Sequence, residues 1–404
     1  MIRKDELEAA PQVSRWTEVK VVSDGATFAQ LRGEWEALLG RSKAGIFNSW
    51  DWLYPWYRRI GPDRKLMILT ARNREGRLVG LMPLCVEEKS VLGRTVRRLS
   101  FLGENHVGAD YLDAIAEAGQ EEELARTFVA ALRERGREWD LIDLVDLASD
   151  SVTVKIFSEA FAPWGAKVEQ TNRWDCPFER FAPGEQWDAF LRRTGRRDNY
   201  LRRKRWLEKQ PGYRIEKTEA AGELARPMSE FFRLHALRWQ GDGGSSGIKG
   251  TGVEAFHRDA TGYLAENGRA RLYTMWVGEQ AVASVYGIVH RGSFIYFQAG
   301  YDPEWRSKSV GLVLVGETFK DALEQGLTEY DFLRGTETYK SDWTTQLRKT
   351  VALRIVPVGG RGALLDRYEN FARQTRNLVK RLLPGQWVER IRRARRKTLA
   401  VATT

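Results

Sequence analysis

The residues best suited to chemistry lie between Arg291 and Trp343. A helix is expected over 310–324; the loop before it carries two cations, and a glycine lies in its first turn. A helix start presents free backbone N–H groups and the positive end of the helix dipole, which favour a phosphate or pyrophosphate. The alternative is an ordinary strand-to-helix turn with a solvated basic pair. The residues of this expected cofactor-binding site are Arg306, Lys308, Ser309, Val310 and Gly311.

A second group of reactive side chains lies in the sequence DFLRGTETYK, which begins in the next expected strand and continues into the loop after it. Glu337, Tyr339 and Lys340 offer a carboxylate, a phenol and an ammonium, which suffice for a general base, an acid for a leaving group and an electrostatic clamp. Asp331 precedes them as a further catalytic candidate, and Arg334 as a substrate-binding one. An unreactive surface loop is the alternative interpretation.

A third candidate pair lies on the helix expected over 228–240. His235 and Arg238 are three residues apart and therefore share one face of that helix. A histidine placed in this way can deprotonate an incoming amine, with the arginine as a substrate-binding group. The alternative is a core histidine that is hydrogen-bonded to the backbone.

The elements that must position these groups form a repeated pattern. Three strands are expected between 270 and 301, because aromatic and β-branched residues fill runs separated by turn residues. The helix over 310–324 and a short strand after it complete the order hairpin, strand, helix, strand. The same order is expected in the first half, over 65–72, 77–88, 94–103, 119–136 and 138–147. The sequence therefore predicts an α/β protein with two copies of one fold.

The stretch 186–356 resembles the acyltransferase domain named after the CelD/BcsL proteins of cellulose biosynthesis. The resemblance rests on FFRLHALRW (231–239), AGYDPEW (299–305), the glycine-containing helix start and DFLRGTETYK (331–340). Many members have serine-proline-glycine at the helix start, where this chain has serine-valine-glycine, so the phosphate loop is expected to differ slightly in shape. That family is of the GNAT type and is related in fold to the Fem-type aminoacyltransferases.

The resemblance implies tandem GNAT-like domains, each a mixed, mostly antiparallel sheet flanked by helices. It implies acyl-CoA as co-substrate, with the pyrophosphate held at 309–311. The acyl group would pass directly to an amine acceptor, so no covalent enzyme intermediate is required. It also favours the catalytic interpretation of His235 and of the loop that follows Asp331.

The chain divides into four expected parts: a flexible N-terminus (1–15), a degenerate GNAT-like domain (16–180), a GNAT acyltransferase domain (185–358) and a basic amphipathic helical tail (359–404). The helix expected over 119–136 begins with three glutamates, which would repel a pyrophosphate. The first copy is therefore expected to bind no CoA and to form one wall of the acceptor cleft. Asp110 and Tyr111 either face that cleft as substrate-binding residues or are ordinary surface-turn residues.

The net charge of +11 indicates an anionic partner, such as acyl-CoA, phospholipid headgroups or RNA. Eight Lys and Arg residues lie between 192 and 205, where a phosphate-bearing partner competes with a solvated helix face as the explanation. Between 361 and 397, twelve cations face only three anions in an amphipathic pattern. This tail either binds a membrane surface or packs on the body of the protein.

At 404 residues, the chain is long enough for two globular domains. Its two cysteines and four histidines show no ligand spacing, so no metal is expected. No apolar run reaches the roughly 18 residues that span a bilayer, and no signal-peptide core is present. We expect a cytoplasmic protein that associates with the inner membrane; the sequence leaves its oligomeric state open.

The sequence thus predicts an acyl-CoA-dependent N-acyltransferase. Its acceptor would be a lipid amine, such as a sphingoid base, or a polysaccharide precursor. One alternative is a Fem-like enzyme that transfers an aminoacyl group from tRNA to a peptidoglycan precursor. The other is a non-catalytic adaptor of polysaccharide export.

Overall fold

The computed structural model describes residues 16–104, 107–240, 248 and 250–382. The stretch 1–15, predicted to be flexible, and the end of the predicted tail, 383–404, lie outside the described residues.

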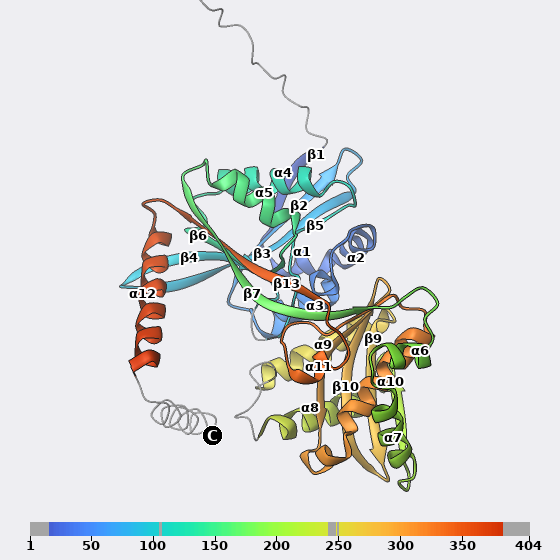
Figure 1. The fold of residues 1–404 in the computed structure, drawn as a ribbon. Helices are drawn as coiled ribbons and strands as arrows, with labels where there is room; N and C mark the ends of the chain where they lie inside the picture. Colours follow the sequence, from blue (N-terminus) through green and yellow to red (C-terminus); the bar gives the residue numbers. More distant parts are fainter. Residues whose placement is uncertain (1–15, 105–106, 241–247, 249, 383–404) are drawn as a thin grey trace, which may run out of the picture.

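A 13-stranded sheet runs through the whole molecule (Figure 1). One strand, β5 (Ile115–Ala116), pairs with β3 beside the main path. The other strands, in spatial order, are β1 (Trp16–Val22), β2 (Lys65–Asn73), β3 (Leu78–Val91), β4 (Arg94–Phe101), β6 (Leu141–Ala148), β13 (Leu347–Pro357), β7 (Ala166–Arg180), β12 (Glu329–Asp331), β11 (Ser293–Tyr301), β10 (Gln280–His290), β9 (Ala270–Val277) and β8 (Arg214–Thr218).

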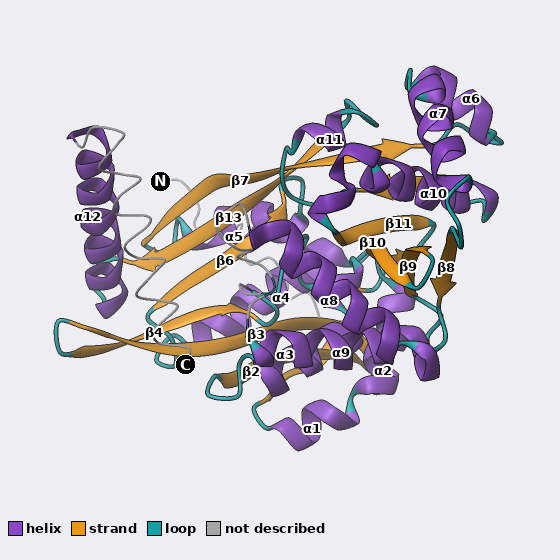
Figure 2. Ribbon diagram, turned by 90° about the horizontal axis from the view of Figure 1, so that it is seen from below, coloured by secondary structure: helices purple, strands orange, loops and turns teal. Residues whose placement is uncertain are grey.

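Helices cover both faces of this sheet, as Figure 2 shows. In the second half, α10 and α7 lie on one face and α8 and α9 on the other. The helices are α1 (Gly25–Gln30), α2 (Arg32–Arg41), α3 (Trp50–Arg59), α4 (Glu121–Glu134), α5 (Val152–Phe161), α6 (Trp187–Arg193), α7 (Arg197–Glu208), α8 (Ala225–Gln240), α9 (Thr251–Glu266), α10 (Val310–Glu324), α11 (Thr338–Ser341) and α12 (Arg361–Leu382), with short 3-10 turns at Ile46–Asn48, Ala221–Glu223 and Pro303–Lys308.

The predicted repeat is present. The order β2-β3-β4-α4-β6 in the first half recurs as β9-β10-β11-α10-β12 in the second. Among the described strands only two pairs are parallel, β4 with β6 and β11 with β12, and they hold equivalent places in the two halves. All other pairs are antiparallel, so the prediction of tandem, mostly antiparallel α/β sheets is confirmed.

Two strands join the halves into one sheet. The first part of β7 pairs with β13 from Pro177 back to Ala166, and its last residues, Phe178 to Arg180, pair with β12. β13 falls within the range expected for the second domain, 185–358, but it lies between β6 and β7 in the sheet of the first half. Local sequence pattern cannot reveal such a long-range insertion. The domain limits at 180, 185 and 358 stay a prediction.

The aromatic core also crosses between the halves. Trp52 of α3 packs edge-on against Phe256 of α9 and Phe297 of β11, with ring centroids 5.0 and 5.3 Å apart. All three side chains are buried. Since such rings contribute large apolar areas, this contact fixes the first half against the helices and strands that surround the candidate site.

Candidate active site

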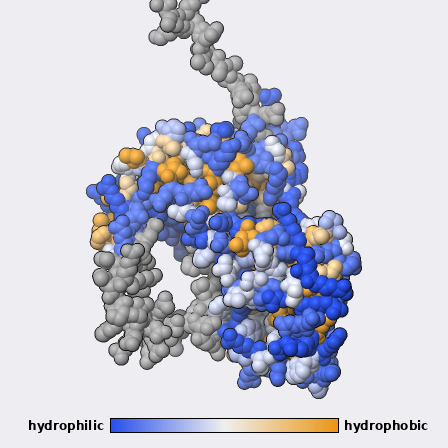
Figure 3. All heavy atoms as spheres, viewed as in Figure 1, coloured by the Kyte–Doolittle hydropathy of each residue, from blue (hydrophilic) through white to orange (hydrophobic). Residues whose placement is uncertain are grey.

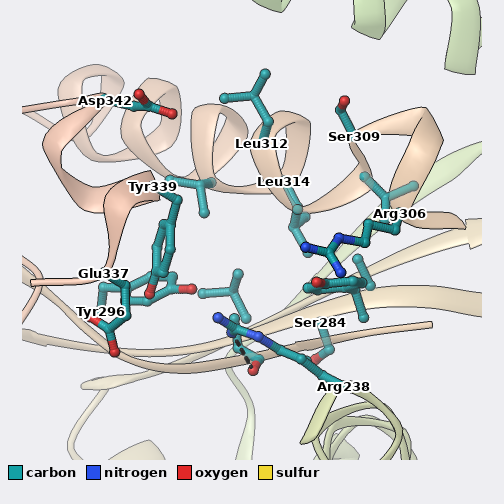
Figure 4. A pocket seen from close by; sticks show the side chains of 18 of the residues that line it. Arg238, Ser284, Tyr296, Arg306, Ser309, Leu312, Leu314, Glu337, Tyr339 and Asp342 are labelled. Atoms are coloured by element: carbon teal, nitrogen blue, oxygen red, sulfur yellow. Dashed lines mark hydrogen bonds between the residues drawn. The ribbon is translucent and has the colours of Figure 1, made fainter. Parts of the chain in front are cut away.

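A cavity of about 960 Å³ opens where β11 and β12 separate. The two strands pair in parallel over only three residues, Ser293 to Ile295 with Glu329 to Asp331. Beyond this point β12 ends and β11 continues to Tyr301. The cavity lies between the part of β11 that extends beyond β12, the start of α10 and the segment around α11 (Figure 4).

The start of α10 forms one end of the cavity. Ser309 takes the N-cap position in a left-handed conformation, with φ 59°, and its side chain makes no capping bond. The first backbone N–H groups of the helix are thus left open for an anion. Arg306 points from the preceding 3-10 turn into the cavity, and Val310 and Gly311 line it (Figure 4). Lys308 does not line it; its ammonium lies 4.6 Å from the centre of the Trp206 ring.

Arg238 of α8 enters the cavity from the opposite wall, as Figure 4 shows. It donates a hydrogen bond to the Ala299 carbonyl at 3.2 Å. Its guanidinium carbon lies 5.5 Å from the Tyr301 ring and 5.6 Å from the Tyr339 ring. Arginine stays charged in proteins, so Arg238 places a fixed positive charge among aromatic rings at the centre of the cavity.

Glu337 and Tyr339 reach the same space from the loop at the start of α11. Burial raises the pKa of the Tyr339 phenol well above its ordinary value, so the hydroxyl keeps its proton at neutral pH. Lys340 is turned away and buried. Its ammonium lies 2.9 Å from the Glu337 carboxylate and donates to the Arg334 carbonyl at 2.7 Å.

His235 lies behind the cavity wall and lines none of the cavities described here. Its side chain is 2% exposed, and burial, aided by the charge of Arg238, lowers the pKa of the imidazole to about 4. Gly300 of β11 lies against its backbone, where a Cβ would come within 2.3 Å of the His235 nitrogen. A histidine in this place is neutral at pH 7, and its role as base stays a prediction.

Asp331 and Tyr111 belong to a second cavity, of about 810 Å³, at the junction of the halves. The Tyr111 hydroxyl lies 3.4 Å from the Asp331 carboxylate. Burial raises the pKa of Asp331 to about 7, although the Arg348 guanidinium lies 3.2 Å away. Asp110 lines neither cavity; it is fully buried against Arg334. None of the predicted residues Asp110, Tyr111, Asp331 and Arg334 therefore lines the cavity that contains Glu337 and Tyr339.

Several residues of the first cavity were not predicted. Tyr296 lies 6.2 Å from Tyr339, ring centre to ring centre, and the buried Ser284 hydroxyl has no hydrogen-bond partner among the described residues. The alternation of SFIYFQAGY marks Tyr296 and Tyr301 as strand residues, but it does not show that the strand would lose its neighbour there. Asn199 of α7 and Asp342 after α11 complete the polar lining.

The basic stretch before the second half is largely neutralised. Arg192 and Arg197 bind Asp188, Arg193 binds Glu179 and Glu185, Arg196 binds Asp342, and Lys204 binds Glu317. Among the described residues, no carboxylate forms an ion pair with the remaining three cations, although Arg203 donates to the Ser307 carbonyl at 3.4 Å. Figure 3 shows the hydrophilic surface over α6 and α7. The three cations without a carboxylate are Arg202, Arg203 and Arg205.

The fold and the cavity define a tandem GNAT-like protein, and comparison with known proteins supports this class. A family model described as an acetyltransferase (GNAT) domain matches residues 194–341. The match covers α10, the strands β11 and β12, and the loop that carries Glu337. The chain therefore carries a GNAT domain and is an acyltransferase. The narrower resemblance to the CelD/BcsL proteins remains a prediction.

Among solved structures, the crystal structure of FemX matches with a TM-score of 0.59 and 12% identity, over 83% of this chain and 97% of that one. The C-terminal domain of a putative lysylphosphatidylglycerol synthetase from Agrobacterium fabrum matches with a TM-score of 0.49 and 11% identity, over 85% and 96%. A tandem GNAT protein from the clavulanic acid biosynthesis pathway gives 0.44 and 12%, over 83% and 98%. At 12% identity the likeness to FemX concerns the fold alone. The other two structures, with TM-scores below 0.5, support no conclusion about this chain. No curated protein sequence matches the chain.

The described part of the chain contains neither a metal-binding cluster nor a membrane-spanning helix. No group of three or more His, Cys, Asp or Glu side chains in that part of the chain is arranged to hold a metal ion. Within the same residues, no helix combines the length and the apolar character needed to cross a bilayer.

The buried histidines predict a measurable acid sensitivity. Burial lowers the pKa of His257 to about 3, and neither of its ring nitrogens has a hydrogen-bond partner in the part of the chain that the structure describes. The unfolded imidazole binds a proton below pH ~6.5, so stability is complete above that pH and falls as the pH decreases, by about 1.4 kcal/mol per unit for each such group. In thermal unfolding between pH 6.5 and 4.5, His257→Phe should lose stability less steeply than the wild type.

The same variant at pH 8 serves as the control, since the imidazole is neutral there in both states and only packing differs. Parallel pH curves for His257→Phe and the wild type would contradict the prediction.

Proposed function

We propose that this protein transfers an acyl group from acyl-CoA to an amine held in the cavity between α10 and the parted strands. The observation that carries the proposal is the convergence, in one cavity, of an open helix start, the Arg238 cation, a carboxylate and a protonated phenol. The donor phosphates would lie against the backbone at 309–311 beside Arg306. The thioester would then lie near Arg238, Glu337 and Tyr339.

The proposed reaction needs no covalent enzyme intermediate. The amine nitrogen attacks the thioester carbonyl carbon and forms the new C–N bond, while Arg238 stabilises the negative charge that develops on the carbonyl oxygen. Glu337 accepts the proton released by the amine. The C–S bond breaks, and the sulfur takes the proton of Tyr339, giving an amide and free CoA. Glu337 then returns the proton to Tyr339 through solvent.

The acceptor is proposed to be a lipid amine, such as a sphingoid base. A polysaccharide precursor is the alternative acceptor. The support is α12. Its inner face is fixed to the body by buried Leu365 and by Asp366, which lies 3.1 Å from both Lys167 and Arg354. Tyr368 and Phe371 are 53% and 70% exposed. Aromatic side chains presented in this way on a basic helix are suited to an anionic membrane surface.

One observation favours a second candidate function, aminoacyl transfer from tRNA as in Fem-type enzymes. Arg202 and Arg203 lie on α7 without carboxylate partners among the described residues, close to the mouth of the donor cavity, where Arg202 donates to Asn199 at 3.3 Å. A polyanion longer than CoA would use them. Retention of an aminoacylated tRNA in a gel-shift assay, with no acyl-CoA binding, would favour this function; an adaptor would bind neither donor.

The donor proposal predicts that alanine and glutamate at position 311 have different effects on acyl-CoA binding. A Cβ at this position would meet nothing closer than the Tyr301 ring at 3.8 Å, so alanine fits. Gly311→Glu instead places a carboxylate where the pyrophosphate is proposed to bind. Octanoyl-CoA should raise the melting temperature of the wild type and of Gly311→Ala but leave that of Gly311→Glu unchanged. An equal shift in all three proteins would place the donor elsewhere.

The catalytic proposal predicts different effects at two neighbouring phenols. Tyr339→Phe and Glu337→Gln should each lower kcat by about 10²-fold, as expected when general acid–base help is lost. Tyr301→Phe should change kcat less than about 3-fold, although its ring lies as close to Arg238. Thiol release would be followed with acetyl-, octanoyl- and palmitoyl-CoA, using sphinganine or glucosamine as acceptor.

His235→Gln tests, in the same assay, whether His235 is the base that deprotonates the amine. If it lowers kcat more than Glu337→Gln does, at an unchanged melting temperature, His235 and not Glu337 is the base.

The membrane proposal predicts that the wild type floats with anionic liposomes at low salt. The double variant Tyr368→Ser/Phe371→Ser should float at least several-fold less, because it loses the apolar anchors while the contacts of Leu365 and Asp366 with the body stay intact. Trp164→Ser, which removes another partly exposed aromatic, is the control. Equal flotation of all three proteins would remove the main support for a lipid acceptor.

A further inference from the structure

The catalytic loop is tied to the first half of the chain. Directly after β12, the Phe332 N–H donates to the Pro177 carbonyl at 2.9 Å, and the Gly335 N–H donates to the Asp175 carbonyl at 3.0 Å. Both acceptors belong to β7. Arg334 lies between these two anchored residues. Its backbone N–H donates to the Asp110 carboxylate at 3.0 Å.

The Arg334 side chain reaches further into the first half. Its guanidinium lies 2.8 Å from one Asp110 oxygen and 3.2 Å from Asp146 of β6, and it also donates to the Ala109 carbonyl. Asp110 and Asp146 are 0% and 2% exposed. All three contacts are made by one guanidinium nitrogen, Nη2, and charge-assisted contacts of this kind are among the stronger polar interactions in proteins. The buried Nε of Arg334 has no hydrogen-bond partner among the described residues, and none of the contacts of this side chain belongs to either cavity.

The backbone around this contact is held in uncommon conformations. Tyr111, Asp146 and Leu333 all have positive φ values, of 59°, 61° and 57°. For residues with a Cβ such conformations are unfavourable and persist only where surrounding contacts hold them. Each of these three residues is Asp146 itself or the direct neighbour of Asp110 or Arg334, so the three strained positions gather at this one contact.

The contact continues to the active-site loop through Lys340. The Arg334 carbonyl accepts from the Lys340 ammonium at 2.7 Å, and the Gly335 carbonyl accepts from it at 3.3 Å. The same ammonium lies 2.9 Å from the Glu337 carboxylate, and the Lys340 side chain is 4% exposed. One buried ammonium thus joins the backbone at Arg334 to the proposed base in the first cavity.

We infer that Arg334 is a positioning residue for the acyl transfer proposed above. Held by Asp110 and Asp146, it fixes the backbone to which Lys340 ties Glu337, and it sets where the Glu337–Tyr339 segment stands relative to the donor. The first half of the chain thereby acts on catalysis without touching the substrate. This assignment replaces the predicted substrate-binding roles of Arg334 and Asp110 and the predicted catalytic role of Lys340, and it rests on the proposed function.

The chain provides a matched control for this contact. Arg269 also crosses from the second half to two carboxylates of the first, lying 2.7 Å from Glu36 and 3.4 Å from Asp51. Its side chain is 20% exposed, against 28% for Arg334, and Asp51 is fully buried. None of the contacts of Arg269 leads to the Glu337 loop. Arg334→Gln and Arg269→Gln should therefore lower the melting temperature similarly. They should differ in hydrogen–deuterium exchange of the Glu337 loop and in kcat.

Two readouts separate positioning from general stability. Hydrogen–deuterium exchange over 336–344 should be at least 10-fold faster in Arg334→Gln and unchanged in Arg269→Gln, because the bonds from Lys340 N to Glu337 O and from Trp343 N to Lys340 O would lose their support. With the acyl-CoAs and amines named above, kcat should fall at least 10-fold in Arg334→Gln, while KM for the acyl-CoA stays within about 3-fold. Arg269→Gln should keep both values.

Equal exchange over 336–344 in the two variants, or equal kcat, would overturn the inference. If Arg334→Gln does not fold, Arg334→Lys and Arg269→Lys are compared, since both keep the positive charge but replace the planar guanidinium by an ammonium. If the wild type itself releases no thiol from acetyl-, octanoyl- or palmitoyl-CoA, the proposed function fails. Exchange over 336–344 still decides whether Arg334 holds the loop.

Discussion

The pairing of β7 with partners in both halves is the constraint on which the site depends. Its first part lies beside β13 in the first half of the sheet, and its end lies beside β12 in the second. Asp175 and Pro177, just before the change of partner, hold the backbone at Gly335 and Phe332. Without this strand, the point where β11 and β12 separate would have no fixed relation to the loop that carries Glu337.

Much of the local structure could be predicted from the sequence. The run SFIYFQAGY became β11 with the expected limits, and the apolar spacing after Ser309 became α10 over the expected residues. Both patterns are local, since they reflect side-chain shape in strands and periodicity in helices. The glycine in the first turn of α10 also lines the cavity, as its place in the sequence indicated.

The rest depends on contacts between distant residues. Nothing in the stretch 347–357 indicates that it enters the first half of the sheet, and nothing in the sequence near Asp110 names Arg334 as its partner. His235 and Arg238 share a helix, yet only the arginine reaches the cavity, because Gly300 brings β11 against the backbone at His235. Five of the eight cations in the basic run bind carboxylates, and two of these carboxylates, Asp342 and Glu317, lie far along the chain.

The continuous sheet has a mechanical consequence. In proteins whose lobes meet only through a linker, a cleft can open by rotation about a hinge. Here β7 pairs with β13 in the first half and continues directly into its pairing with β12 in the second, so a hinge motion between the halves would break the hydrogen bonds between β7 and β12. We therefore expect the two lobes to move little relative to each other. Substrates would then enter the first cavity past the side chains at its rim, and not through a hinged cleft.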